Sequence, residues 1–160
     1  MKPVTTAREM RDIRETQDVE RLVEVFYSRV RADAVLGNIF DDIAHVDWPR
    51  HLPQMYQFWE TILFTRPGYK GNPLLPHIEL NERMRREQGV GLKSSDFERW
   101  TELFHATIDE LFSGPRAERA KRSAVSVGRH ILASVSDTSG SLTLLPYRRQ
   151  SRNAESQNTE

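Results

Sequence analysis

The segment "DVERLVEVFYSRV", residues 18–30, carries the clearest helical pattern in this chain of 160 residues. Its apolar side chains recur in steps of three and four, which aligns them along one face of an α-helix. They are Val19, Leu22, Val23, Phe26, Tyr27 and Val30. Thr16 and Asp18 are both suitable caps for the first turn. We therefore expect an amphipathic helix that begins at Thr16 or Asp18 and turns this stripe toward a core.

A second helix is expected to end near Phe64, and Pro53 affects where it begins. Proline has no amide hydrogen to donate and opposes the interior of a helix. We therefore predict a regular helix from about His51, although Pro49 would suit a first turn. The side chains expected on its inner face are Trp48, His51, Leu52, Met55, Phe58, Trp59, Ile62 and Leu63.

The second half of the chain predicts further helices separated by glycine and proline. "TRPGYKGNPLLP", residues 65–76, is typical of an ordered loop, and "NERMRREQGVGLK", residues 81–93, predicts a short helix and a flexible joint. Ser95 to Glu98 has the spacing of a capping box, and Gly114-Pro115 separates the helix that follows from the last one. The two expected stripes are Phe97, Trp100, Leu103, Phe104, Thr107, Ile108 and Leu111, then Ala117, Ala120, Ala124, Val127, Ile131, Leu132 and Val135. Since no long strand-like alternation occurs, we expect an all-α fold.

These patterns define the expected domain organisation. Residues 1–15 are predicted to form a loose polar arm, residues 16–136 one helical domain, and residues 137–160 a mostly disordered polar tail. The start of the chain lacks the apolar centre of a secretory signal, and no window resembles a membrane helix. We therefore expect a soluble, cytoplasmic protein.

Composition and motifs exclude several classes of function. The 23 basic and 23 acidic residues balance, so no overall charge would attract nucleic acid or an anionic membrane. The absence of cysteine excludes disulfides, thiolate catalysis and cysteine-ligated metals. The sequence also lacks a zinc-binding helix motif, a phosphate-binding glycine loop and the serine elbow of hydrolases.

Two histidines in apolar surroundings, His51 and His77, are the remaining candidates for chemistry. In "GNPLLPHIEL", residues 71–80, a leucine would pack as well as His77 without requiring partners for two ring nitrogens. Such a histidine is, taken alone, more often a hydrogen-bonded core residue than a ligand. The chain also has more large rings than so small a core needs: Phe26, Tyr27, Phe40, Phe58, Trp59, Phe97, Trp100 and Phe104. A flat apolar cofactor such as haem, which needs one neutral imidazole, would account for both features.

Four segments then follow one another along most of the chain, from about Val19 to Val135. They are "VFYSRVRADAVLGNIF", "HLPQMYQFWETILF", "YKGNPLLPHIEL" and "DFERWTELFHATIDELFSGPRAERAK". Together they resemble the group III truncated haemoglobins of bacteria. The resemblance implies a truncated globin fold, a helical sandwich around a haem, and haem b as the cofactor.

The resemblance also implies roles for individual residues. His77 matches the proximal histidine, the only protein ligand of the iron. Tyr27 and Trp100 match the distal hydroxyl and indole donors, and His51 matches the histidine of the distal helix. Contacts to the cofactor are expected from Phe40, Met55, Phe58 and Trp100.

Two features depart from the family pattern. The segment between His77 and Trp100 is longer than expected, which leaves the shape of the proximal pocket open. Pro53 lies just after His51 and would favour an outward, gate-like side chain about as much as an inward one.

The implied function is the binding of dioxygen and other diatomic ligands. Two neutral donors would slow oxygen release, which suits nitric oxide or peroxide chemistry better than oxygen delivery. Whether the protein is an enzyme stays open, with nitric oxide dioxygenase or peroxidase-like activity as candidates. A monomer served by an unidentified reductase is expected. The alternatives are a haem-based sensor or scavenger, and a haem-free helical interaction module whose rings only fill a core.

Overall fold

The structure, a computed structural model, describes residues 10–137 and consists of helices joined by short loops. In chain order the helices are α1 (Thr16–Ala32), α2 (Ala34–Gly37), the π-helix η1 (Asn38–Ile43), α3 (Trp48–Phe64), α4 (Leu74–Gln88), α5 (Ser94–Leu111) and α6 (Pro115–Asp137). Residues 10–137 contain no strand, which confirms the predicted all-α class. None of the helices in this range is both long enough and apolar enough to cross a membrane.

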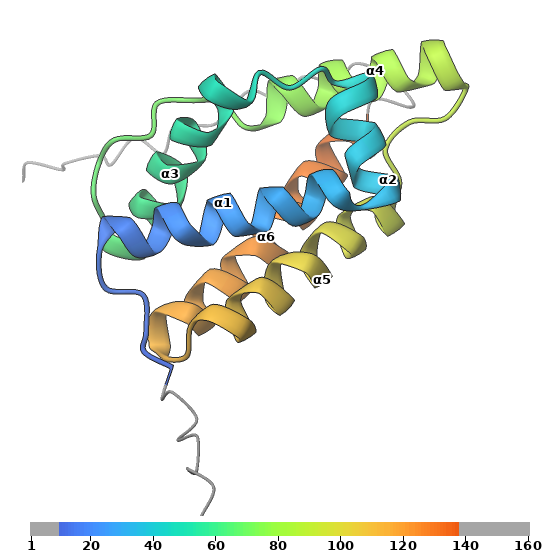
Figure 1. The fold of residues 1–160 in the computed structure, drawn as a ribbon. Helices are drawn as coiled ribbons and strands as arrows, with labels where there is room; N and C mark the ends of the chain where they lie inside the picture. Colours follow the sequence, from blue (N-terminus) through green and yellow to red (C-terminus); the bar gives the residue numbers. More distant parts are fainter. Residues whose placement is uncertain (1–9, 138–160) are drawn as a thin grey trace, which may run out of the picture.

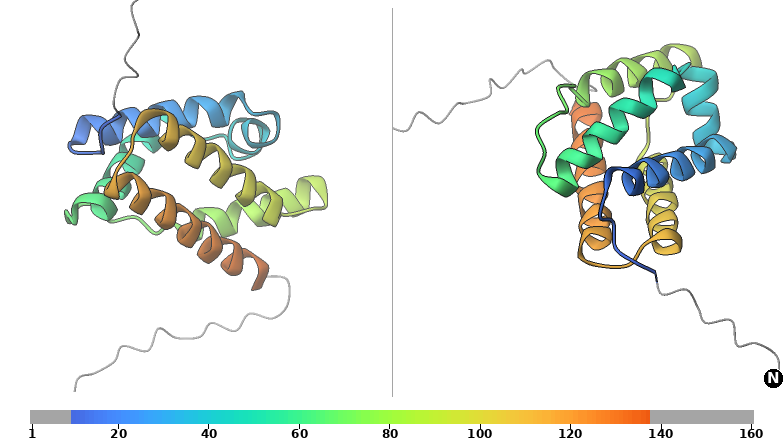
Figure 2. Two further views of the ribbon diagram at one scale, coloured as in Figure 1. Left: turned by 90° about the horizontal axis from the view of Figure 1, so that it is seen from below. Right: turned by 60° about the vertical axis from the view of Figure 1, so that its left-hand side comes forward.

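Helix α1 lies in the middle of the fold and contacts elements on both sides (Figure 1). It packs against α3 on one side and against α5 on the other. Helices α5 and α6 form a hairpin and lie side by side in every view (Figure 2). Helix α4 contacts α6 and η1, so the chain folds back over the end of the hairpin. This arrangement leaves the inner faces of α1, α3, α4 and α5 directed at a common interior.

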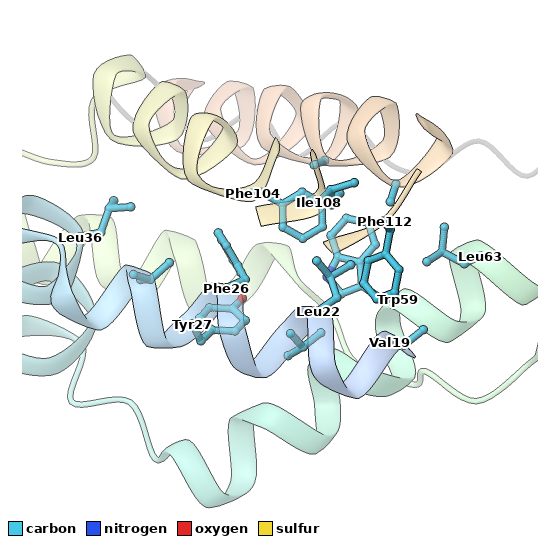
Figure 3. Close-up of a cluster of buried hydrophobic side chains, with 14 of the residues drawn as sticks. Val19, Leu22, Phe26, Tyr27, Leu36, Trp59, Leu63, Phe104, Ile108 and Phe112 are labelled. Carbon is cyan, nitrogen blue, oxygen red and sulfur yellow. The ribbon is translucent and has the colours of Figure 1, made fainter. Parts of the chain in front are cut away.

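The core is built on the predicted stripe of α1, whose apolar side chains are all buried. Phe26 is central, because its ring makes edge-to-face contacts with Trp100 and Phe104. Phe104 in turn stacks on Trp59 with ring centroids 4.6 Å apart (Figure 3). Aromatic pairs of this kind stabilise a fold beyond the apolar area that they bury. Part of the aromatic excess therefore belongs to the core.

The predicted start of α3 was wrong, because the helix begins at Trp48 and continues through Pro53. The carbonyl of Asp47 accepts hydrogen bonds from the amides of Arg50 and His51, so the first turn is already formed before the proline. Pro53 stands in the second turn, where its missing amide removes only one helical bond. The packing of this helix against α1 outweighs that loss.

Helix α4 differs from the predicted short helix and flexible joint. It begins at Leu74, which places His77 in its first turn, and it ends at Gln88, followed by the cap residue Gly89 with a positive φ of 75°. The side chain of Asn81 is fully buried, and its oxygen accepts a hydrogen bond of 2.8 Å from the amide of Leu92. A side chain at Gly91 would collide with that oxygen. The additional residues between His77 and Trp100 therefore extend α4 beyond the predicted short helix. They also form a connection to α5 that is held in place by the Asn81 side chain.

Helix α5 also begins earlier than predicted, with its cap at Lys93 rather than at Ser95. The carboxylate of Asp96 accepts a hydrogen bond of 2.9 Å from the amide of Lys93, which satisfies a donor at the start of the helix. The predicted start of α6 at Pro115 is confirmed.

The described end of the predicted N-terminal arm is packed rather than loose. Ile13 is fully buried in the core. The carboxylate of Asp12 accepts hydrogen bonds of 2.9 Å from the amides of Arg116 and Ala117, which caps the first turn of α6. An apolar residue and a capping carboxylate explain why this polar segment is fixed. Residues 1–9 of the arm and residues 138–160 of the predicted tail (137–160) lie outside the described residues, and residue 137 is the last of α6.

We predict that Ile13→Ala lowers the free energy of unfolding by about 2–4 kcal/mol, because it leaves a cavity in the core. Urea unfolding followed by circular dichroism measures this change. Met10→Ala is the matched control, since Met10 is 46 % exposed and its truncation should change stability by no more than about 0.5 kcal/mol. Equal midpoints for both variants would show that the segment contributes nothing to the core.

Candidate functional site

A cavity of about 530 Å³, here called the central cavity, lies between the helices and is lined by residues of α1, α2, η1, α3, α4, α5 and α6. Its size falls in the range of pockets that bind small molecules and cofactors. All the side chains singled out from the sequence line it, namely Tyr27, Phe40, His51, Met55, Phe58, His77 and Trp100. Most of its remaining wall is apolar, including Leu36, Ile39, Leu80, Phe97 and Ile131. The fold thus brings the whole predicted set to one place.

His77 enters the cavity from the first turn of α4, which proline helps to form. Pro73 caps the helix and Pro76 follows within the first turn, where backbone amides have no acceptor inside the helix. The side chain of Asn72 accepts a hydrogen bond of 3.0 Å from the amide of Leu74 and fixes the start. This local sequence therefore sets the position from which the imidazole projects.

The orientation of His77 is determined by a hydrogen bond to its own helix. Its Nδ1 lies 2.5 Å from the carbonyl oxygen of Pro73. A carbonyl can only accept, so Nδ1 carries the proton and Nε2 keeps an unprotonated lone pair. Burial lowers the pKa of His77, and the bond to Pro73 offsets part of that effect. The result is an oriented imidazole of the kind that binds a metal.

Tyr27 projects from α1 and is almost completely buried. Burial raises the pKa of its hydroxyl, and a hydrogen bond with the side chain of Trp100 lowers it in part. The tyrosine O–H can donate to a partner in the cavity. Tyr27 and Trp100 both contact the ring of Phe26, and the role of Trp100 as a donor to a bound ligand stays a prediction.

His51 projects from α3 and lines the same cavity, with its ring 5.3 Å from that of Tyr27. Its Nε2 is buried and has no hydrogen-bond partner among residues 10–137. Burial, with a smaller contribution from His77, lowers the pKa of His51 to about 4. The imidazole is therefore neutral near pH 7. Pro53 does not turn it outward, so the gate-like alternative was wrong for this structure.

The site fits a flat, apolar group that carries a metal ion. The apolar walls suit its faces, and the free Nε2 of His77 suits the metal. A buried polar atom without a partner is costly, and the Nε2 of His51, a residue that lines the cavity, is such an atom. The polar groups and the apolar walls of the cavity therefore both fit an apolar group that carries a metal ion.

Several lining residues were not assigned to the site from the sequence. Leu80 lies three positions after His77 and Phe97 three positions before Trp100, so helical spacing could have identified both. Tyr69 reaches the cavity from the loop before α4 and contacts Phe58 at 5.2 Å between ring centroids. Arg83 donates to the carbonyl of Ile43 at its edge. No sequence signal marked these two residues, since the position of Tyr69 depends on the path of a loop and that of Arg83 on the packing of α4 against η1.

No family model matches the chain. The chain is 27 % identical over 100 residues to a group 3 truncated haemoglobin of Campylobacter jejuni, covering 61 % of this chain and 72 % of that protein. A crystal structure of a group III truncated haemoglobin from the same organism superimposes with a TM-score of 0.65 at 24 % identity, over 81 % of this chain and 97 % of the other. The predicted resemblance is thereby confirmed: the chain has the truncated globin fold and is similar in sequence to a group III truncated haemoglobin.

Proposed function

We propose that this chain is a globin-type haem protein in which haem b fills the central cavity and His77 is the protein ligand of the iron. The bond from Nδ1 of His77 to Pro73 carries the proposal, because it leaves the Nε2 lone pair directed away from the helix. When bound, haem would supply an iron centre for dioxygen, nitric oxide and similar ligands. The sequence similarity to a group 3 truncated haemoglobin supports the same function.

The apolar lining would hold the cofactor mainly by burial. Phe40, Met55, Phe58 and the ring of Trp100 all line the cavity and offer large apolar surfaces. Each Å² of apolar surface removed from water contributes roughly 25 cal/mol. Phe58 is further fixed by edge-to-face contacts with Trp59 and Tyr69, so this part of the wall is formed before any ligand binds. These residues bind and position the cofactor but perform no proton transfer.

Tyr27, Trp100 and His51 would form the polar side of the site. Tyr27 keeps its proton because burial raises its pKa, and its O–H can donate to a bound ligand that carries negative charge. The indole N–H of Trp100 would fix the tyrosine oxygen, and neutral His51 would provide a second polar atom. Each neutral hydrogen bond contributes on the order of 1 kcal/mol, so two would slow ligand release roughly tenfold or more.

Slow release favours redox chemistry of nitric oxide or peroxide over oxygen delivery. A site that delivers oxygen must release it readily, whereas a polar, water-poor pocket holds it. The three side chains would orient the ligand and exclude water while the reaction proceeds. Such redox chemistry would require a reductase as a partner. We also propose that the protein acts as a monomer in the cytoplasm.

We predict that His77→Gly lowers haem affinity by at least about 100-fold, because the metal ligand is lost. Titration of the purified chain with haemin, followed by the Soret band, measures the affinity. Added imidazole should restore the band in His77→Gly, since it can occupy the vacated position. His130→Gly is the control, because His130 is an exposed histidine of α6. Equal affinity of His77→Gly and wild type would contradict the proposed ligand.

The tyrosine is expected to matter more than the tryptophan for ligand retention. Tyr27→Phe should accelerate dioxygen release from the haem-loaded protein roughly tenfold, because the direct donor is removed. Trp100→Phe should accelerate it by about threefold or less, since the indole acts by fixing Tyr27. Stopped-flow release kinetics measure both rates. Tyr56→Phe is the control, because that hydroxyl donates to Glu24 at the surface. The opposite order would mean that Trp100 is the direct donor.

Dioxygen release should hardly change between about pH 5 and about pH 9. His51, with a pKa of about 4, gains a proton only below this range. The raised pKa of Tyr27 moves its ionisation above the range. The same stopped-flow measurement in a series of buffers tests this expectation. A clear step near pH 6.5 that disappears in His51→Gln would show that His51 titrates as an exposed histidine does.

A further inference from the structure

A second cavity, of about 510 Å³, lies at the surface beside the tyrosine end of the central cavity. It is lined by polar and apolar side chains of α1, η1 and α3, namely Glu24, Tyr27, Ser28, Arg31, Ala32, Asp41, Trp48 and Leu52. We call it the outer cavity. Tyr27 lines the outer and the central cavity alike. The two spaces are therefore separated by no more than a layer of side chains.

Trp48 is the largest side chain in that layer. One side of its indole lines the outer cavity. The same indole contacts Phe40 in a stacked arrangement at 5.9 Å, Tyr27 at 5.4 Å and His51 at 5.6 Å between ring centroids. These three rings all line the central cavity. Trp48 thus stands between the outer cavity and the residues proposed to face the bound ligand.

The indole is held in this position by a pair of charged side chains. Its Nε1 donates a hydrogen bond of 2.7 Å to Oδ1 of Asp41, which projects from η1. The other carboxylate oxygen accepts a hydrogen bond of 3.2 Å from Nε of Arg31, and the Arg31 guanidinium lies 4.9 Å from the centre of the Trp48 ring. A bond to a carboxylate is stronger than a neutral one. Arg31 and Asp41 therefore act together on one indole.

The Trp48 side chain can move out of this position without disturbing the core. Arg31 is exposed and Asp41 is partly exposed, so water competes for their ion pair and weakens it. Trp48 and Asp41 belong to the first turn of α3 and to η1, at the edge of the helical body. Single-turn π-helices such as η1 occur frequently at functional sites. Breaking the bond to Asp41 would free the indole to swing into the outer cavity.

We propose that Trp48 is a door for small ligands between the outer cavity and the central cavity, and that Asp41 and Arg31 are its latch. The proposal rests on the proposed function, because a haem in the central cavity would leave small ligands in need of a separate route to Tyr27. Diatomic ligands pass during brief openings, and bulkier molecules are held back by the indole. Trp48 therefore controls both the rate of ligand exchange and the size of ligand admitted.

The test uses the haem-loaded protein and two probes of different size, carbon monoxide and n-butyl isocyanide. Association rates after flash photolysis are compared for wild type, Asp41→Leu, Trp48→Ala and Trp48→Phe. Asp41→Leu should raise the carbon monoxide rate by about fivefold or more, because one charge-assisted hydrogen bond no longer closes the door. Trp48→Ala should raise both rates, and the isocyanide rate by the larger factor. Asp42→Asn, at the next position and exposed, is the control.

A second measurement follows the latch directly and does not depend on ligand chemistry. Hydrogen exchange of the Trp48 indole N–H is followed by NMR in the carbon monoxide complex, with Trp48→Phe used to assign the signal. Asp41→Leu should accelerate this exchange by about fivefold or more, since the bond that protects the N–H is lost. If Trp48→Ala fails to fold, Asp41→Leu and Trp48→Phe still decide the question.

The results of these experiments distinguish failure of the door proposal from failure of the haem proposal. A wild type that forms no Soret band with haemin overturns the haem proposal and the door with it. Normal Soret bands with unchanged association rates in Asp41→Leu and Trp48→Phe overturn the door alone. Equal acceleration of both probes by Trp48→Ala would overturn the role in size selection. Faster association together with faster indole exchange in Asp41→Leu supports the latch.

Discussion

The hydrogen bond from Nδ1 of His77 to the carbonyl of Pro73 is the interaction on which the site depends. It selects the tautomer, fixes the plane of the ring and leaves one nitrogen lone pair uncommitted. Its geometry follows from the start of α4, where a proline cap supplies a carbonyl four positions before the histidine. Pro73, which caps α4, therefore also determines the orientation of the His77 imidazole.

The fold could largely be read from the sequence, because its helices bury regular stripes. The α1 stripe and the start of α6 were predicted correctly, since steps of three and four and a glycine-proline pair depend only on local geometry. The start of α3 and the packing of Ile13 were not. Pro53 is tolerated because the turn before it is already hydrogen-bonded, and Ile13 is buried by contacts distant in sequence. Local rules cannot anticipate effects that depend on tertiary packing.

The candidate site was predicted as a set of residues but not as a set of contacts. All the singled-out residues line one cavity, as the resemblance implied. The direction of each polar group depends on neighbours that the sequence does not place. The side chain of Trp100 affects the pKa of Tyr27, and His51 lines the cavity despite Pro53. Trp48 was expected only on the inner face of its helix, yet its partner Asp41 comes from η1. Side-chain identity was thus accessible from sequence, and hydrogen-bond direction was not.

Aromatic side chains at three different depths have different roles in the described part of the chain. Phe26, Trp59 and Phe104 are fully buried and hold α1, α3 and α5 together. Tyr27 and Trp100 extend this stack to the wall of the central cavity, so their positions inherit the rigidity of the core. Trp48 lies farther out, in contact with the cavity rings but held by exposed charges. Rigid packing in the interior keeps the polar donors in place. A more weakly held side chain at the edge is compatible with the passage of small ligands.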